Sequence, residues 1–143
     1  MAQDASSEGQ SKRRYRMLRS EELKDLLLDL YQASAAGNQS FFEGLISNDD
    51  DVITIGSEPE EYWQGYSTIL RERSSRSSTS DIGSIVPGDI QAFVEGAVGW
   101  VADRPTLKLT DGSELRLRLT AVFRSEAGRW KLVQQHVSIG VPN

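Results

Sequence analysis

The C-terminal half of the chain carries three turn signals, and their spacing restricts the possible folds more than any other feature. From Ile82 onward, runs of β-branched, aromatic and alternating residues are separated by glycine-containing pairs. The pairs are Glu95-Gly96, Asp111-Gly112 and Ala127-Gly128. Because such pairs favour tight hairpin turns, the pattern predicts a meander of four long antiparallel strands. We expect the strands to bend at Pro87-Gly88 and Pro105, since proline cannot donate to a strand ladder.

The N-terminal half shows helical spacing instead. Ser20 is a good N-cap for a helix that ends at Gly37-Asn38, and one apolar stripe runs along it, formed by Leu23, Leu26, Leu27, Leu30 and Tyr31. A short second helix follows, capped by Asn38 or Ser40, with a buried side made by Phe41, Phe42, Leu45 and Ile46.

A short strand at residues 52–55 precedes a loop and a third helix over residues 66–75. The third helix places Tyr66, Ile69, Leu70 and Arg73 on or beside one face. Helices followed by an antiparallel sheet predict one α+β domain over residues 18–143, after a polar, disordered tail at residues 1–17. A sheet covered by helices on one face can curl and enclose a pocket.

Composition excludes several function classes. The 143 residues include no cysteine, which removes disulfides and thiolate chemistry and favours a reducing, cytoplasmic location. No run approaches the roughly 20 apolar residues of a membrane span, and the N-terminus lacks the apolar region of a signal peptide. The net charge of −5 argues against a nucleic-acid partner. The basic segment from Lys12 to Arg19 is interpreted as a solvated tail, with an anionic partner as the alternative.

The last strand contains the only histidine of the chain, and its register decides where that side chain points. A two-residue turn at Ala127-Gly128 would place Phe123 opposite Leu132 and Leu119 opposite His136. This register puts Gln134, His136 and Ser138 on the apolar face beneath the helices, and a slip of one residue would reverse it. Unpartnered polar groups there would each cost about 1–3 kcal/mol. They indicate either a wetted cavity or a core histidine with its own hydrogen-bond partner.

The strand over residues 97–104 adds a second set of candidates. Trp100 and Arg104 share one face with Val98 and Ala102, and Asp103 lies on the other. An inward Arg104 would anchor an anionic ligand group, because guanidinium binds carboxylate in a bidentate fork. The alternative is an arginine that extends from the strand end into water.

Three segments resemble SnoaL-like proteins of the nuclear transport factor 2-like (NTF2-like) superfamily, over residues 20–143. They are "EEYWQG", "GAVGWVAD" and the closing "GRWKLVQQHVSIGVPN". The family pattern W-K-(I/L)-V-x-x-H-x-S matches Trp130, Lys131, Leu132, Val133, His136 and Ser138, and its W-x-G matches Trp63 and Gly65.

The resemblance implies a cone-shaped α+β fold, in which a curved antiparallel sheet wraps around the N-terminal helices and encloses a pocket open at one end. It also implies a homodimer formed through the outer sheet face, to which Val122, Val133, Val137 and Ile139 would contribute. Arg104 is similar in place to a pocket-facing arginine in the association domain of calcium/calmodulin-dependent protein kinase. Relatives often carry H-x-H-x-S, whereas this chain has Gln134 at the first position, which argues against a histidine pair or a metal site.

We therefore expect a domain that binds a small organic ligand, without metal, cofactor, nucleic acid or membrane as a partner. The expected ligand-binding residues are Tyr62, Trp63, Tyr66, Trp100, Arg104, Leu119, Phe123, Gln134, His136 and Ser138. The alternative is an isomerase, dehydratase or cyclase type of enzyme that uses His136 as general base and Arg104 as anion stabiliser. Asp103 is the nearest match to the general base of related isomerases and cyclases, but alternation places it on the outer face.

Overall fold

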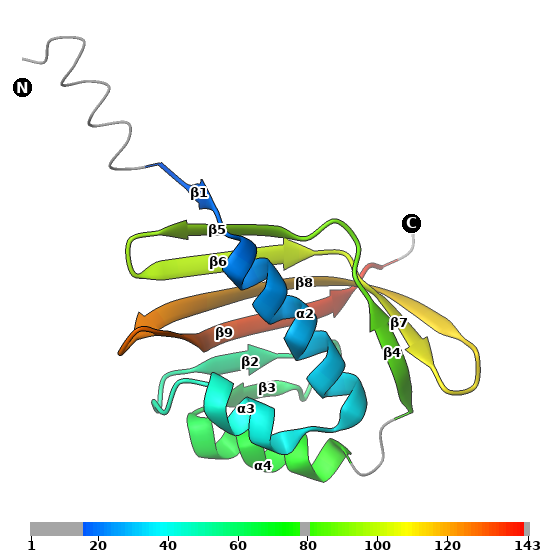
Figure 1. The fold of residues 1–143 in the computed structure, drawn as a ribbon. Coiled ribbons are helices and arrows are strands. Elements are labelled where there is room, and N and C mark those ends of the chain that lie inside the picture. Colours follow the sequence, from blue (N-terminus) through cyan, green and yellow to red (C-terminus); the bar gives the residue numbers. More distant parts are fainter. Residues whose placement is uncertain (1–15, 78–80, 142–143) are drawn as a thin grey trace, which may run out of the picture.

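The computed structural model describes residues 16–77 and 81–141 (Figure 1). Most of the expected tail, including Lys12, Arg13 and Arg14, lies outside these residues. The three described helices are α2 (Glu21–Ala36), α3 (Gln39–Leu45) and α4 (Tyr66–Ser77). The strands are β1 (Leu18–Arg19), β2 (Ile53–Ile55), β3 (Tyr62–Gln64), β4 (Ile82–Val86), β5 (Gln91–Glu95), β6 (Val98–Asp103), β7 (Thr106–Leu109), β8 (Glu114–Glu126) and β9 (Arg129–Ile139).

The predicted helix caps are confirmed. The Ser20 hydroxyl accepts a hydrogen bond of 3.1 Å from the backbone N–H of Leu23, which begins α2. Gly37 ends this helix at φ 64°, in the left-handed region that glycine enters without a steric penalty. Asn38 then caps α3. Since a single residue separates the end of α2 from the cap of α3, the chain reverses tightly here.

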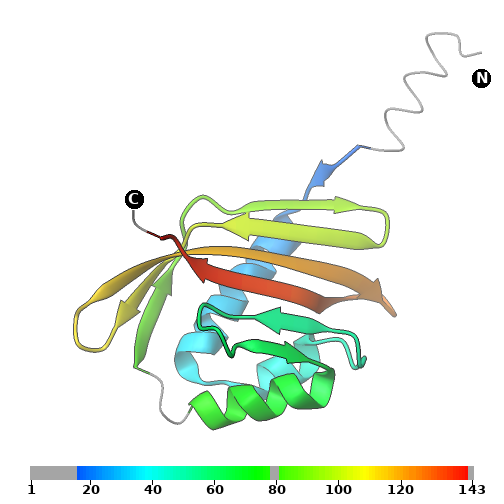
Figure 2. The same cartoon turned by 180° about the vertical axis from the view of Figure 1, so that it is seen from behind.

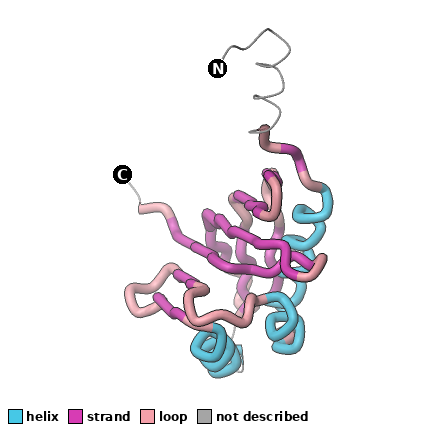
Figure 3. The backbone as a smooth tube through the Cα atoms, turned by 90° about the vertical axis from the view of Figure 1, so that its left-hand side faces the viewer, coloured by secondary structure: helices cyan, strands magenta, loops and turns pink. Residues whose placement is uncertain are grey.

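The sheet follows the order β1-β5-β6-β8-β9-β2-β3. Neighbouring strands are antiparallel except β2 and β9, which run parallel. Helix α2 crosses one face of the sheet, and the opposite face of β5, β6, β8 and β9 has no described helix over it (Figures 2 and 3). The α+β class and the curved antiparallel sheet are therefore as predicted. Strand β3 was expected to be part of a loop; it is stabilised by pairing with β2.

The two proline positions explain the curvature. Strands β6 and β7 both pair with β8, at residues 119–124 and 114–116, and Pro105 lies between them. Pro87-Gly88 divides β4 from β5 in the same way, since β4 pairs with β7 and β5 with β6. The predicted bends thus swing the β4–β7 pair away from the rest of the sheet, toward the C-terminal end of α2 (Figure 1). The region predicted as a meander of four long strands therefore contains the strands β4 to β9, in which β4 pairs with β7 and β6 with β8.

The core lies between α2 and the inner sheet face. Leu23, Leu27 and Phe123 are completely buried, and Leu132 is nearly so. Gly99 lies directly beneath α2, because a Cβ atom at this position would come within 2.3 Å of the Leu23 side chain. The absence of a side chain at Gly99 therefore makes room for the helix.

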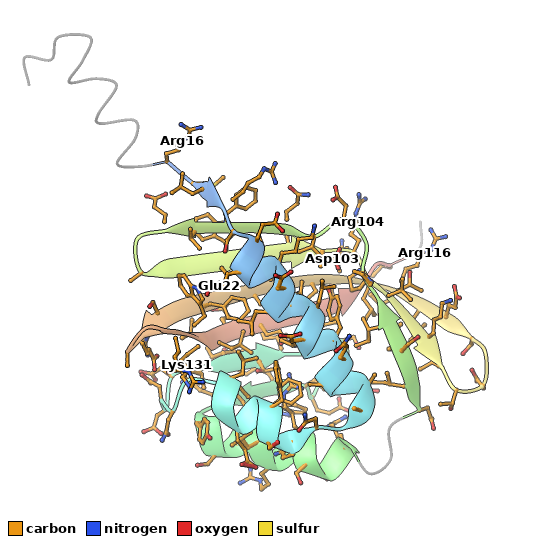
Figure 4. All side chains as sticks on the ribbon, in the orientation of Figure 1. Arg16, Glu22, Asp103, Arg104, Arg116 and Lys131 are labelled. Carbon is orange, nitrogen blue, oxygen red and sulfur yellow. The ribbon has the colours of Figure 1, made fainter. Side chains whose placement is uncertain are left out.

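Two residues of the closing family pattern hold the last hairpin against the helices. Trp130 donates from its indole Nε1 to the Glu22 carboxylate over 2.6 Å, and Lys131 donates to the backbone carbonyl of Gly44. Figure 4 shows Glu22 at the start of α2 and Lys131 beside α3. Because both bonds join β9 to a helix, these side chains stabilise the packing of the domain.

Candidate functional site

A cavity of about 320 Å³ lies between the helices and the bent part of the sheet. Its walls come from the C-terminal half of α2, from α3 and α4, and from the inner face of the strands. The apolar lining consists chiefly of Leu30, Phe42, Trp63, Ile85, Leu107, Leu117, Leu119, Val137 and Ile139. A volume of this size is at the lower end of the roughly 300–1,000 Å³ typical of small-molecule sites.

The floor of the cavity depends on a β-bulge in β9. Phe123 lies opposite Leu132 as predicted, but Val122 lies opposite Gln134, so Val133 is an extra residue between the two pairs. A bulge of one residue exchanges the two faces of every following position. Gln135 and Val137 therefore line the cavity, together with Ile139.

The predicted inward placement of Gln134, His136 and Ser138 is wrong for this reason. His136 is paired with Thr120 and Gln134 with Val122 on the outer face, and both side chains are exposed. Ser138 lies opposite Arg118 on the same face and is half-buried.

The predicted orientation of Trp100 and Arg104 is also reversed. Gly99, Val101 and Asp103 are buried on the inner face, whereas Trp100 is half-buried on the outer face and contacts Phe93, with ring centroids 6.3 Å apart. Arg104 is exposed at the end of β6, and Figure 4 shows it apart from Asp103, which lies near α2. Helix α2 occupies the space beneath Gly99, and the large indole of Trp100 lies on the outer face.

The other predicted ligand-binding residues divide into two groups. Trp63 and Leu119 line the cavity. Tyr62 is 58% exposed, Tyr66 donates its hydroxyl to the Glu43 carbonyl over 2.8 Å, and Phe123 is buried in the core outside the cavity lining.

Arg73 is the most unusual side chain of the cavity. It comes from α4, and its guanidinium carbon lies 4.0 Å from the centroid of the Phe42 ring. Its Nε is buried without a hydrogen-bond partner, and among the described residues no carboxylate forms an ion pair with it. Burial lowers the pKa of Arg73 to about 10, because the charged form loses its hydration. The side chain still carries its charge at neutral pH.

Gln135 is the second polar group without a partner. It is 6% exposed, lies between Thr54 and Ala121 in the centre of the sheet, and its Oε1 accepts no hydrogen bond. Buried acceptors of this kind are rare in native proteins, and each requires an explanation. Unbroken alternation along the last strand would place Gln135 on the outer face, and the bulge turns it inward.

An ion pair lies on another wall of the cavity. Arg76 approaches Glu61 with an Nη1–Oε2 distance of 3.7 Å, and its guanidinium lies 5.0 Å from the centroid of the Trp63 ring. All three side chains line the cavity. The aromatic ring and the pair together give this wall an apolar surface with a polar edge.

Tyr31 and Asp103 form a buried polar pair beside the cavity. Tyr31 lines it, and its hydroxyl donates to the Asp103 carboxylate over 2.7 Å. The same carboxylate accepts from the backbone N–H groups of Gly88 and Arg104, over 3.1 and 2.8 Å. Burial, and then the hydrogen bond and charge of Asp103, raise the pKa of Tyr31. The Asp103 carboxylate, which accepts all of these hydrogen bonds, joins α2 to the sheet. Asp103 itself lies outside the cavity lining.

Neither a metal-binding group nor a membrane-spanning helix is found in the part of the chain that the structure describes. No three His, Cys, Asp or Glu side chains gather there in a way that could hold a metal ion. None of the described helices combines the length and the apolar character that crossing a membrane requires.

A curved sheet with helices on its inner face and a cavity between them defines a nuclear transport factor 2-like α+β domain. The chain belongs to the SnoaL-like domain family, whose profile matches residues 23–142. No curated protein matches the chain.

Solved structures share this fold at low sequence identity. An NTF2-like protein of unknown function from Pseudomonas putida KT2440 is 15% identical and has a TM-score of 0.75, with 87% of this chain and 92% of that chain covered. A structure described as a candidate dehydratase, from Streptomyces avermitilis, is 18% identical with a TM-score of 0.71, covering 85% and 96%. One described as a candidate ketosteroid isomerase, from Parabacteroides distasonis ATCC 8503, is 19% identical with a TM-score of 0.69, covering 85% and 91%.

Proposed function

We propose that this domain binds a small, largely apolar organic molecule in the cavity between the helices and the inner sheet face. The observation that carries the proposal is the lining: a mostly apolar wall with a few converging polar groups, of which Arg73 Nε and Gln135 Oε1 have no hydrogen-bond partner among the described residues. This composition is typical of small-molecule sites, where apolar area supplies affinity and a few polar anchors supply orientation. Two solved structures with this fold are described as a candidate dehydratase of the NTF2-like family and a candidate ketosteroid isomerase.

The catalytic alternative built on His136 and Arg104 has lost its structural support, because neither side chain lines the cavity. Among the described lining residues the carboxylate is that of Glu61, and it is paired with Arg76. The arrangement therefore favours binding over acid–base chemistry by the residues first expected.

The test uses two neutral probes, indole and p-cresol, followed by amide chemical shifts. We expect shifts concentrated on cavity residues of the wild type. Ser34→Phe would fill part of the cavity from α2, and we expect it to weaken binding by about tenfold or more. Gln32→Phe is the matched control, since Gln32 is exposed on the same helix, and it should leave binding unchanged. Absence of cavity shifts at millimolar probe, or equal binding by Ser34→Phe, would contradict the proposal.

We further propose that the partner on the outer sheet face is a second copy of the chain. Phe93, Trp100 and Val122 form an apolar centre on this face, and polar side chains surround it. Of the four residues expected at the interface, Val137 and Ile139 line the cavity and Val133 packs against the core, so Val122 is joined on this face by the aromatic pair instead. Light scattering should give a dimer mass for the wild type and a monomer mass for Trp100→Lys. A monomeric wild type at micromolar concentration would refute it.

A further inference from the structure

Arg73 is half-buried with a fully buried Nε, and among the described residues no carboxylate forms an ion pair with its positive charge. A guanidinium group has five N–H donors and no acceptor, so it is satisfied only by acceptors that surround it. The Phe42 ring covers one face of the group through a cation–π contact, but a ring face does not satisfy the in-plane N–H of Nε. The buried Nε thus has no acceptor among the described residues and can take one from a ligand.

The burial of Arg73 follows from its position on α4. Arg71, two residues away, has 70% of its side chain exposed and approaches Glu72. Arg73 instead follows Ile69 by one helical turn, on the side of α4 that packs against the core. Its guanidinium group lies against the Phe42 ring, and this partial burial lowers the pKa of Arg73.

The charge of the cavity is opposite to that of the chain. The net charge of the protein is −5, yet the charged side chains that line the cavity are Arg73, Arg76 and Glu61, which leaves one positive charge in excess. Arg76 and Glu61 are paired, so the excess belongs to Arg73. On a mostly apolar wall this half-buried charge attracts a negative ligand more strongly than it would in bulk water.

Gln135 supplies an independent second anchor. Its Oε1 is a buried acceptor without a donor, on the sheet side of the cavity, whereas Arg73 reaches in from the helix side. A ligand that fills the site must present an acceptor to Arg73 and a donor to Gln135. The apolar walls between them require an apolar body.

We propose that the occupant of the cavity is an organic carboxylate whose charge is bound by Arg73 and whose hydroxyl or N–H group donates to Gln135. This inference rests on the proposed binding function and specifies its ligand class. A carboxylate fits because its two oxygens match the planar donor array of a guanidinium group, giving short, charge-assisted hydrogen bonds. The volume of about 320 Å³ limits the ligand to small aromatic or aliphatic acids.

The experiment compares acids with their neutral amides, which keep the size and shape and remove the charge. The pairs are benzoate with benzamide, phenylacetate with phenylacetamide, and 3-phenylpropionate with 3-phenylpropanamide. Dissociation constants come from amide chemical shifts at pH 7. We expect the best acid to bind the wild type about tenfold or more tighter than its amide, because the amide leaves the guanidinium charge without a counter-ion.

Two substitutions assign the effect to a residue. Arg73→Met should abolish the preference for the acid and leave the amide within about threefold, whereas Arg71→Met removes the same charge outside the cavity and should keep the preference. For the second anchor, 4-hydroxyphenylacetate should bind the wild type more tightly than phenylacetate, and Gln135→Met should remove that difference.

The outcomes separate this inference from the binding function. If neutral probes bind in the cavity and no acid exceeds its amide, the carboxylate proposal is overturned and the binding function stands. If an acid is preferred but Arg73→Met retains the preference, the assignment to Arg73 is overturned. If neither acids, amides nor neutral probes perturb the cavity residues, both proposals fail. The wild-type comparison of acid and amide needs no variant to fold.

Discussion

Tyr31 and Asp103 are 72 residues apart in the chain and are joined by a buried hydrogen bond of 2.7 Å. The bond connects the middle of α2 to the end of β6, and Asp103 also accepts from the backbone at the turn between β4 and β5. One carboxylate thus holds together the helix, the sheet and the bend beside the cavity. Since hydrogen bonds to charged groups contribute more than neutral ones, this pair should matter to stability.

We expect Tyr31→Phe to lower the free energy of unfolding by about 1–3 kcal/mol, because it removes one donor from a buried carboxylate. The measurement is urea unfolding at pH 7. Tyr62→Phe is the control, since Tyr62 is 58% exposed, and it should change the stability very little. Equal stability of the two variants would contradict a structural role for the pair.

Because the pKa of Tyr31 is raised, its contribution to the free energy of unfolding should fall at high pH. In the unfolded chain this tyrosine ionises near its ordinary pKa of 10.0, whereas burial and Asp103 keep it neutral in the folded protein. Its stabilising contribution is therefore complete below about pH 10 and is lost as the pH rises above that value. The stability difference between the wild type and Tyr31→Phe should be constant up to about pH 9 and shrink beyond it.

The same shift can be observed directly in the folded protein. Tyrosinate absorbs near 295 nm, and a tyrosine that stays neutral does not contribute. We expect native wild type and native Tyr31→Phe to show equal absorbance changes at 295 nm between pH 8 and pH 11. A change larger by one tyrosine in the wild type would show that the Tyr31 hydroxyl ionises normally and is not buried against Asp103.

Gly99 should tolerate no side chain. A Cβ at Gly99 would approach the Leu23 methyl to 2.3 Å and the Phe93 carbonyl oxygen to 3.1 Å, so α2 would have to move away from the sheet. We expect Gly99→Ala to destabilise the fold by about 1–3 kcal/mol in urea unfolding. Gly44→Ala is the matched control: Gly44 lies within α3 with open space around it, and alanine there should raise stability by up to about 1 kcal/mol.

The bulge at Val133 predicts opposite behaviour for two adjacent glutamines. Gln135→Met keeps the length of the side chain and removes a buried, unpartnered acceptor, so we expect an increase of about 1–2 kcal/mol in the free energy of unfolding. Gln134→Met changes an exposed side chain and should shift stability by less than about 0.5 kcal/mol. The register without a bulge would place Gln134 inward and reverse this order, so the pair of variants tests the bulge itself.

Local interactions explain why much of the fold could be predicted from the sequence. The cap at Ser20, the left-handed turn at Gly37 and the hairpin turns at Gly96, Gly112 and Gly128 depend on residues close in the chain. The bends at Pro87 and Pro105 follow from the missing backbone donor of proline. The family resemblance, carried by Trp63 and the closing segment, identified the same curved sheet.

The candidate site could be predicted only in part, because the register of the strand pairing decides which face of the sheet each side chain lies on. The predicted pairing of Phe123 with Leu132 is correct. The extra residue that follows it in β9 reverses the inner and outer faces of the later residues. A signal for Arg73 was present in the sequence, since a charged residue lay beside the apolar face of the third helix. Whether Arg73 is a surface residue or a cavity residue depends on whether water reaches its side chain in the folded protein.

The sequence by itself determined the helices, the turns, the bends and the family, because these depend on neighbouring residues and on short patterns. Only the tertiary structure decided which side of β9 faces the cavity, that Asp103 meets Tyr31, and that Arg73 lies beside Phe42 with no ion-pair partner in the described part of the chain. The physical reason is that burial and hydrogen-bond satisfaction are properties of distant segments brought together. A one-residue bulge or a helix laid over a strand changes them without any change in local preference.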